Sequence, residues 1–518
     1  MSIKVDPASV TLLPRTENQA LGLGRFAIDF MRGSLGSPDA SVLERTLLFH
    51  VDAVICGISA VALGTNAPRI LRDEAISYPR PDGVAFLGSS VRVAAEKAIV
   101  ADASAVREWD SNGTNFGYNP ALGHVAGEFG HNDFYAVPMA AAQLAGRDGA
   151  YALRGMVLLD EIRGRLAEVF SLKTYKIDHV LHGAIASAAT YGAMLGATAE
   201  QIESAIGMVV AHHVPFRAIR AGKQLSDSKG SSAAISTEAA VLCMQRSMRG
   251  FLGPRDIFRN PEAVFRLFQR TSGESPFDLA IAHSGRDFAV MGMHFKLGLY
   301  EHQSAGALQG VIDLLAKHPE IAHGPDAIRS IRIVAYEPAF GIIGDPAKRD
   351  PRTRQSADHS MVYIVSTKLR KAIEETRRGP LPRENDALWK RLILEPHDYD
   401  AKSIHHPVTR SLMAKIDFAH GGAEYDRRYP DGIPTSLVMT LADGRTLDSG
   451  LVMYPSGHAR NTTADLKGIL ANKFEVLGRL AVDAPAPLID RFQSLATLDA
   501  KALRSLHDFR ILDRGRFE

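Results

Sequence analysis

Cysteine is nearly absent from this sequence: the chain of 518 residues contains only two, Cys56 and Cys243. Both lie in apolar stretches, where a buried free thiol is the usual state of the side chain. Two cysteines so far apart supply no disulfide framework. They are also too few for an iron–sulfur cluster, which usually takes three or four thiolate ligands, so the sequence argues against that cofactor.

An excess of charge of one sign is lacking as well. The formal net charge is +2, so nothing in the overall composition points to nucleic acid or to an anionic membrane as a partner. The first twenty residues have no apolar segment after a basic start, and they predict no signal peptide. Gly, Ser, Thr or charged residues interrupt the longest apolar stretches, so we expect no membrane-spanning segment and a cytoplasmic location.

The common metal and nucleotide signatures are also missing. The sequence has no HExxH, no CxxC, no EF-hand loop and no GxxxxGK[ST] pattern, which argues against zinc, calcium and P-loop nucleotide sites. His212 and His213 are adjacent, so on a helix they would point apart and chelate a metal poorly. We therefore predict no metal site.

What the sequence does contain is a helical pattern over most of its length. Apolar residues on all sides of Leu43–Leu63 predict a buried helix, and Thr198 with Gln201 has the spacing of a capping box. After about residue 276 the pattern changes. Alternation over Ser330–Pro338 predicts a strand, and the Asp-Gly pair inside Thr435–Pro455 predicts a hairpin. We predict a mainly α protein in which residues 1–276 and 456–518 form a large, discontinuous helical domain and residues 277–455 form an inserted, smaller α+β lid domain.

The first candidate site is the segment REWDSNGTNFGYNPALGHVAGEFGHNDFYAV, residues 107–137. It is rich in Gly and holds Asp110, Thr114 and His131. A histidine can accept or give a proton near neutral pH, and a nearby carboxylate can orient it or act as the base itself. The alternative is a surface loop whose His and Asp side chains cap helices.

The second candidate is a basic segment ahead of a helix that we expect to begin near Ser231. Arg217, Arg220, Lys223 and Lys229 lie there among serines. Cations ahead of the free N–H groups of a helix N-terminus favour a carboxylate or a phosphate. The alternative is a basic loop in contact with solvent.

Three further segments hold candidate residues, and each has a structural alternative. Lys296 and His302 lie at a helix start, where the histidine could be satisfied locally. Asp358, His359 and Tyr363 lie around the start of an apolar helix, for which Asp358 could be the N-cap. His458 follows the hairpin, in what could be a crossover turn.

Taken together, these segments resemble the MmgE/PrpD family, which includes 2-methylcitrate dehydratase, cis-aconitate decarboxylase and iminodisuccinate epimerase. The similar motifs occur in order from about Gln19 to Phe474: WDSNGT, EFGH, EIRGRL, SKGSSAAIS, FKLGLYEHQSAGA, SADHSMVYIVSTKL and YPSGHARNTTADLKGILANKF. The resemblance implies a mostly helical domain with an α+β lid, a homodimer, and no metal or organic cofactor. It also implies proton transfer at a carbon next to a carboxylate of a small di- or tricarboxylate.

The resemblance also implies the site residues. The catalytic set is Asp110, His131, Lys229 and His302, and the substrate-binding set is Thr114, Arg220, Lys223, His359, Tyr363 and His458. In this scheme Lys229 pairs with substrate carboxylates, His131 or Asp110 is the general base, and the remaining groups protonate the leaving hydroxyl. Which of them is base and which is acid stays open.

The departures from the family pattern concern residues that would distinguish substrates. Sixteen residues separate Thr114 from His131, where the dehydratases have a short stretch, and Ala167 stands where the decarboxylase has a histidine. The spacing from Lys296 to His302 is shortened and lacks the proline. We therefore expect a cofactor-free hydro-lyase acting on 2-methylcitrate or a similar hydroxy polycarboxylate, with an enlarged active-site loop. The alternatives are another lyase, decarboxylase or epimerase of the family, or a paralogue that binds a carboxylate without turnover.

Overall fold

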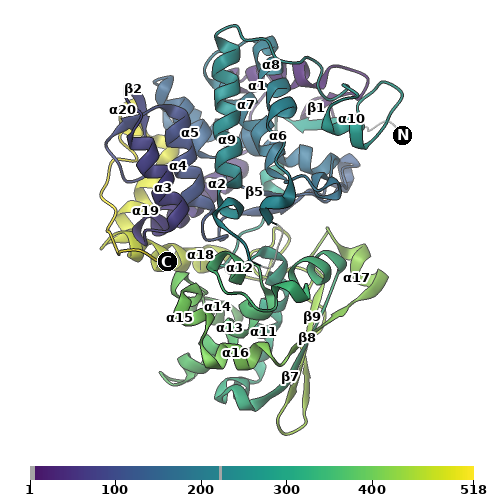
Figure 1. The fold of residues 1–518 in the computed structure, drawn as a ribbon, viewed down its shortest axis with the longest axis vertical. Coiled ribbons are helices and arrows are strands. Elements are labelled where there is room, and N and C mark those ends of the chain that lie inside the picture. Colours follow the sequence, from purple (N-terminus) through teal and green to yellow (C-terminus); the bar gives the residue numbers. More distant parts are fainter. Residues whose placement is uncertain (1–5, 221–223, 518) are drawn as a thin grey trace.

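A computed structural model describes residues 6–220 and 224–517 and confirms a mainly α fold. Figure 1 shows the first nine helices gathered in one part of the molecule, with strand β1 (Val10–Leu13) and the short helix α10 (Val264–Phe268) at one edge. The nine helices are α1 (Gln19–Arg32), α2 (Ala40–Ala62), α3 (Asn66–Ile76), α4 (Ala95–Arg107), α5 (Ala136–Leu144), α6 (Gly149–Val169), α7 (Val180–Met194), α8 (Ala199–His212) and α9 (Asp227–Met248).

Helix α2 is the buried helix expected from its apolar residues. By length and composition alone it could cross a membrane, but 78% of that apolar window is buried inside the protein. The capping box of α8 is confirmed, because Thr198 accepts a hydrogen bond from the Gln201 backbone and Gln201 accepts one from the Thr198 backbone. Local sequence thus determines where this helix begins.

The second part of the molecule combines helices with a four-stranded sheet (Figure 1). The sheet has the order β10 (Thr446–Asp448), β9 (Thr435–Leu441), β7 (Ile328–Ala335) and β8 (Ile416–His420), and only the β7–β8 pair is parallel. The predicted strand and hairpin are both present as β7 and as β9 with β10. The main helices here are α11 (Ala305–Lys317), α13 (Met361–Thr376), α14 (Asn385–Arg391) and α16 (Pro407–Met413), with the shorter α12 (Arg354–Ala357), α15 (Ala401–Ile404) and α17 (Gly422–Arg428).

The C-terminal helices return to the first part of the molecule. Helix α18 (Leu466–Ala481) packs on α2, and α19 (Pro485–Gln493) and α20 (Ala500–Arg504) lie beside α2 and α5, in yellow in Figure 1. The tail continues as an extended segment held by backbone hydrogen bonds, of which Arg514 N–H to Ala62 C=O is 2.8 Å long. The two ends of the chain therefore contribute to one helical core.

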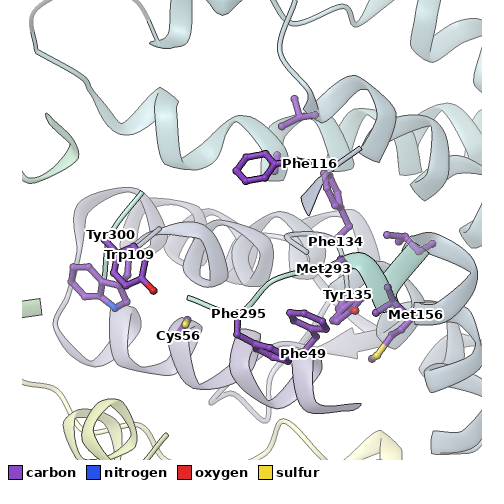
Figure 2. Packing of buried hydrophobic residues seen from close by; sticks show 14 of the residues in the cluster. Phe49, Cys56, Trp109, Phe116, Phe134, Tyr135, Met156, Met293, Phe295 and Tyr300 are labelled. Atoms are coloured by element: carbon purple, nitrogen blue, oxygen red, sulfur yellow. The ribbon is translucent and has the colours of Figure 1, made fainter. Parts of the chain in front are cut away.

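Residues 279–300 also pack into this helical core. Strand β6 (Leu279–Ala282) pairs antiparallel with β1, and the ring of Phe295 stacks on that of Phe49 of α2 at 3.8 Å (Figure 2). The segment then carries the chain to α11. The division into domains at residues 276 and 456 stays a proposal.

Candidate active site

A cavity of about 620 Å³ opens where the two parts of the chain meet. Its lining is strongly basic, with Arg107, Lys173, Lys176, Arg217, Arg220 and Lys348. The acidic and imidazole groups of the lining are Asp110, Glu301, Glu337, Asp345, His131, His179 and His359. A concave site with converging polar groups of this kind is the usual place for a small anionic ligand.

A short hairpin supplies one wall of the cavity. Strands β4 (Thr114–Phe116) and β5 (Phe129–His131) pair antiparallel, with Thr114 opposite His131 and Phe116 opposite Phe129. Thr114 and His131 are therefore buried in a hairpin and not part of a surface loop, which was the alternative for this segment. Because directly opposed residues of an antiparallel pair point to the same face, Thr114 and His131 reach the cavity together.

The residues that connect β4 and β5 are held by buried contacts. His124 Nδ1 lies 2.9 Å from a carboxylate oxygen of Glu168 in α6, and Glu128 accepts a hydrogen bond of 2.6 Å from the backbone of Lys173. Gly117 passes so close to α6 that a Cβ there would lie 2.1 Å from the carbonyl oxygen of Ala167. Only glycine fits at this crossing, and the enlarged loop is a packed part of the structure.

Asp110 is the centre of the charged network. Its backbone is left-handed, with φ of 51°, a strained conformation that Asp tolerates better than most residues and that is common at functional sites. The side chain is fully buried and accepts hydrogen bonds from Arg107 and Lys296. Burial on its own would raise the pKa of Asp110, but Arg107, Lys296 and other nearby cations hold that pKa well below its usual range.

Asp358 connects Lys229 to His359. Its Oδ1 lies 2.7 Å from Lys229 Nζ and 2.7 Å from His359 Nδ1, and His359 Nδ1 is also 3.3 Å from Asp110 Oδ2. Burial lowers the pKa of Lys229 to about 8 against the opposing effect of Asp358 and Asp110. Ser360, whose hydroxyl accepts from the backbone N–H of Tyr363, is the N-cap of α13, so the reading of Asp358 as that N-cap is wrong.

Judged by distance alone, three of these side chains could hold a metal ion together. Single ligand atoms of Asp110, Asp358 and His359 all lie within 4.8 Å of one another. Lys296 and Lys229 already pair with the two carboxylates, however, and Arg107 adds a third cation. Since a divalent ion would have to enter beside three positive groups, the electrostatics disfavour a cation and favour an anion here.

His131 is placed to accept a proton. Its Nε2 lies 3.4 Å from a guanidinium nitrogen of Arg107, and its ring packs edge to face on His179 at 5.0 Å. Burial, reinforced by the charge of Arg107, lowers the pKa of His131 well below its usual value. The imidazole is therefore neutral at pH 7, and its Nδ1 has no partner among the described residues.

The structure brings five of the predicted residues to the cavity. Asp110, Thr114, His131, Arg220 and His359 line it, and Lys229 lies directly behind, with Nζ 3.9 Å from Asp110 Oδ2. Thr114 donates a hydrogen bond to Gly130 C=O, and Arg220 pairs with buried Asp178. Lys223 falls outside the described residues.

Besides Lys229, three predicted residues do not line the cavity. His302 and His458 both stack on His294, with ring centroids 5.1 Å and 4.0 Å from that of His294. Tyr363 donates its hydroxyl to the carbonyl oxygen of Asp398, 2.5 Å away. Burial lowers the pKa of both His302 and His458, so these two imidazoles are neutral at pH 7.

Sequence reasoning missed several lining residues, above all Arg107 and Glu301. Both adjoin motifs that were singled out, Arg107 three residues before Asp110 and Glu301 directly before His302. Removal from solvent, with the Asp110 carboxylate nearby, raises the pKa of Glu301 to about 7. A carboxyl group that titrates near neutral pH in a cavity is a candidate acid or base.

Comparison with known proteins agrees with the geometry. Residues 31–276 match the MmgE/PrpD N-terminal domain. The chain is 24% identical over 469 residues to an alkylcitrate dehydratase of a fungal species, covering 86% of this chain and 85% of that protein. It is 22% identical over 442 residues to 2-methylcitrate dehydratase of Escherichia coli (82% and 84%) and 23% identical over 447 residues to that of Cupriavidus necator (82% and 83%).

Proposed function

The chain carries the MmgE/PrpD N-terminal domain, which confirms the resemblance to that family, and we propose that it is a hydro-lyase that dehydrates a hydroxy polycarboxylate of the 2-methylcitrate type. The relatives named as dehydratases support an enzyme of this kind, a lyase. The single observation that carries the proposal for this chain is that three fixed cations, Arg107, Lys229 and Lys296, converge on Asp110 beside the cavity.

The buried charges next to the cavity form one network of paired groups. Arg107, Lys229, Lys296 and Arg354 supply four positive charges, and Asp110, Asp358, Asp133 and Glu108 supply four negative ones. Removing a proton from a carbon beside a carboxylate places negative charge on that carboxylate. Fixed cations in a site of low dielectric constant stabilise such charge far better than water does.

Substrate carboxylates have two further cations to bind. Arg217 and Lys348 line the cavity, and neither has an ion-pair partner among the described residues. Arg217 can hold a carboxylate with two parallel hydrogen bonds. These contacts would fix the orientation of the acid before the reaction begins.

The proton transfers are assigned to His131 and Glu301. Neutral His131 takes the proton from carbon, and the arrival of an anionic substrate raises its basicity. Asp110 is the weaker candidate for base, because Arg107 and Lys296 already occupy its carboxylate. Glu301, partly protonated near pH 7, gives its proton to the departing hydroxyl, which leaves as water. The products are one alkene and one water molecule. His131 then loses its proton to solvent, and Glu301 takes one up.

The proposal is tested with purified protein treated with a chelator. It would be offered 2-methylcitrate, citrate and cis-aconitate separately, with ultraviolet absorbance to detect a conjugated alkene and proton NMR to identify products. Alkene formed from 2-methylcitrate is the expected result. Loss of carbon dioxide from cis-aconitate would instead identify a decarboxylase, and no change with any of the three would overturn the proposed substrate type.

A further inference from the structure

The hairpin gives the cavity an apolar wall that a small polycarboxylate does not need. Phe116 and Phe129 both line the cavity and pack edge to face at 5.5 Å. The ring of Tyr429 packs on Phe116 at 5.5 Å, and Lys173 Nζ lies 4.1 Å from the ring centroid of Phe129. Each of the two rings thus has a packed neighbour, of which Lys173 also lines the cavity.

A second group of apolar residues lines the same cavity. Leu225, Pro338, Ile343 and Ala347 belong to the lining, and Ile343 and Leu225 are buried. The same lining holds the charged groups around Asp110. The lining thus divides by chemistry into charged groups that suit carboxylates and apolar side chains that can cover a hydrocarbon group.

The size of the cavity agrees with such a division. At about 620 Å³ it falls in the range of cavities that enclose drug-sized ligands. A substrate with only a methyl substituent would leave the apolar residues in contact with water, at a cost in free energy that scales with their exposed area.

We propose that the substrate carries an alkyl or aryl arm longer than methyl, and that this arm packs between the Phe116–Phe129 wall and Ile343. The inference rests on the proposed function, because the carboxylate end of the same molecule occupies the charged region near Asp110. The residues between Thr114 and His131 supply both rings of this wall, Phe116 in β4 and Phe129 in β5.

Two chemical series separate this inference from the proposed reaction. Binding is measured by calorimetry with unreactive 2-alkylsuccinates from methyl to pentyl, and turnover is measured with the matching 2-alkylcitrates. Each methylene buried on the wall is expected to tighten binding about fourfold, the factor that corresponds to roughly 0.8 kcal/mol. The kcat/KM for alkylcitrates is expected to rise with the same series.

Variants then locate the arm. Phe129→Ala should flatten the dependence of affinity on chain length, and Ile343→Ala, in the second group of apolar lining residues, should do the same if the first variant does not fold. Phe251→Ala is the matched control, because Phe251 is 55% exposed and does not line the cavity.

The outcomes are distinguishable. Tighter binding with chain length but no dehydration of any alkylcitrate would sustain the arm and overturn the proposed reaction. Dehydration of 2-methylcitrate, with affinity and kcat/KM that stay flat or fall along the series, would overturn the arm and sustain the reaction. A chain-length dependence that survives both Phe129→Ala and Ile343→Ala would also overturn the proposed position of the arm.

Discussion

Lys229 and Asp358 form a fully buried ion pair, with Nζ and Oδ1 2.7 Å apart. The pair joins α9 to the end of α12, and its two residues are 129 positions apart in the sequence. The same Asp358 carboxylate also contacts His359, which lines the cavity. Lys229 therefore acts on the cavity through its neighbours in this structure, as a group that sets the local charge and positions His359.

The first prediction concerns removal of that charge. Lys229→Met leaves the buried Asp358 carboxylate without its ammonium partner, which typically costs about 3–5 kcal/mol of the free energy of unfolding. It also removes one of the cations that would stabilise developing negative charge, and we expect kcat/KM to fall by about 100-fold or more. Thermal unfolding and steady-state kinetics measure the two effects separately.

A matched control separates catalysis from stability. Lys371→Met breaks another shielded ion-pair cluster, in which Lys371 lies 2.8 Å from Asp398 and 2.9 Å from Glu395, away from the cavity lining. This variant should unfold at a lower temperature and keep its kcat/KM per folded molecule. An equal loss of activity in both variants would contradict the role given to Lys229.

The second prediction concerns substrate binding. Arg217 has no ion-pair partner among the described residues, so Arg217→Ala leaves no buried carboxylate uncompensated. A hydrogen bond to a charged group is worth about 1.5–3 kcal/mol, so we expect KM to rise roughly 10- to 100-fold with kcat little changed. Arg249→Ala, an exposed arginine outside the cavity, is the control. A fall in kcat at constant KM would place Arg217 in the chemical step instead.

Local features of the fold could be predicted because short-range physics determines them. The capping box of α8 needs only Thr198 and Gln201, and the hairpin of β9 and β10 needs only alternation and an Asp-Gly pair. The buried helix α2 follows from its apolar residues alone. In each case the signal and the structure lie within about twenty residues of sequence.

The site could be predicted only in part, because side-chain orientation depends on long-range packing. His302 and His458 have the right residue type and neighbourhood, yet both stack on His294 instead of lining the cavity. Lys296 contacts Asp110 across 186 residues of sequence, and no spacing rule gives that contact. Glu301 was missed for a related reason: its raised pKa comes from tertiary burial and from Asp110.

The third prediction tests Glu301 as the acid. Because its pKa lies at about 7, the protonated form is lost as the pH rises, and kcat/KM of the unaltered enzyme should decline above pH 7. Glu301→Gln cannot give up a proton, so activity should fall by about 100-fold or more, and the remaining activity should not show that decline. If kcat/KM of the variant still declined above pH 7, the decline would come from the titration of another group.

Glu301→Gln should also change how the free energy of unfolding depends on pH. The folded-state pKa of Glu301 is raised above the ordinary value of 4.5, so between about pH 4.5 and 7 the folded protein binds more protons than the unfolded chain. Its contribution to the free energy of unfolding is therefore full at low pH and is lost as the pH rises through about 7. Thermal melts across this range should show a smaller decline for Glu301→Gln than for the unaltered protein.

The last prediction concerns the C-terminal tail, which reaches the residue next to Asp110. The ring of Phe517 packs edge to face on Trp109 at 5.2 Å, and the indole N–H of Trp109 donates to Ser59 Oγ at 3.0 Å. Since Asp110 follows directly in a strained conformation, loss of this packing should let its carboxylate shift.

Phe517→Ala should therefore lower kcat several-fold and reduce the free energy of unfolding by about 1–3 kcal/mol, because an aromatic contact and its buried area are lost. Phe509→Ala is the matched control: Phe509 lies in the same tail and packs on Phe492 at 5.9 Å, away from Trp109. Both variants should melt at a lower temperature, but only Phe517→Ala should lose kcat. Equal kinetics in the two would show that the tail stabilises the helical core without positioning Asp110, and a selective loss would make the tail part of the apparatus that holds the charged centre in place.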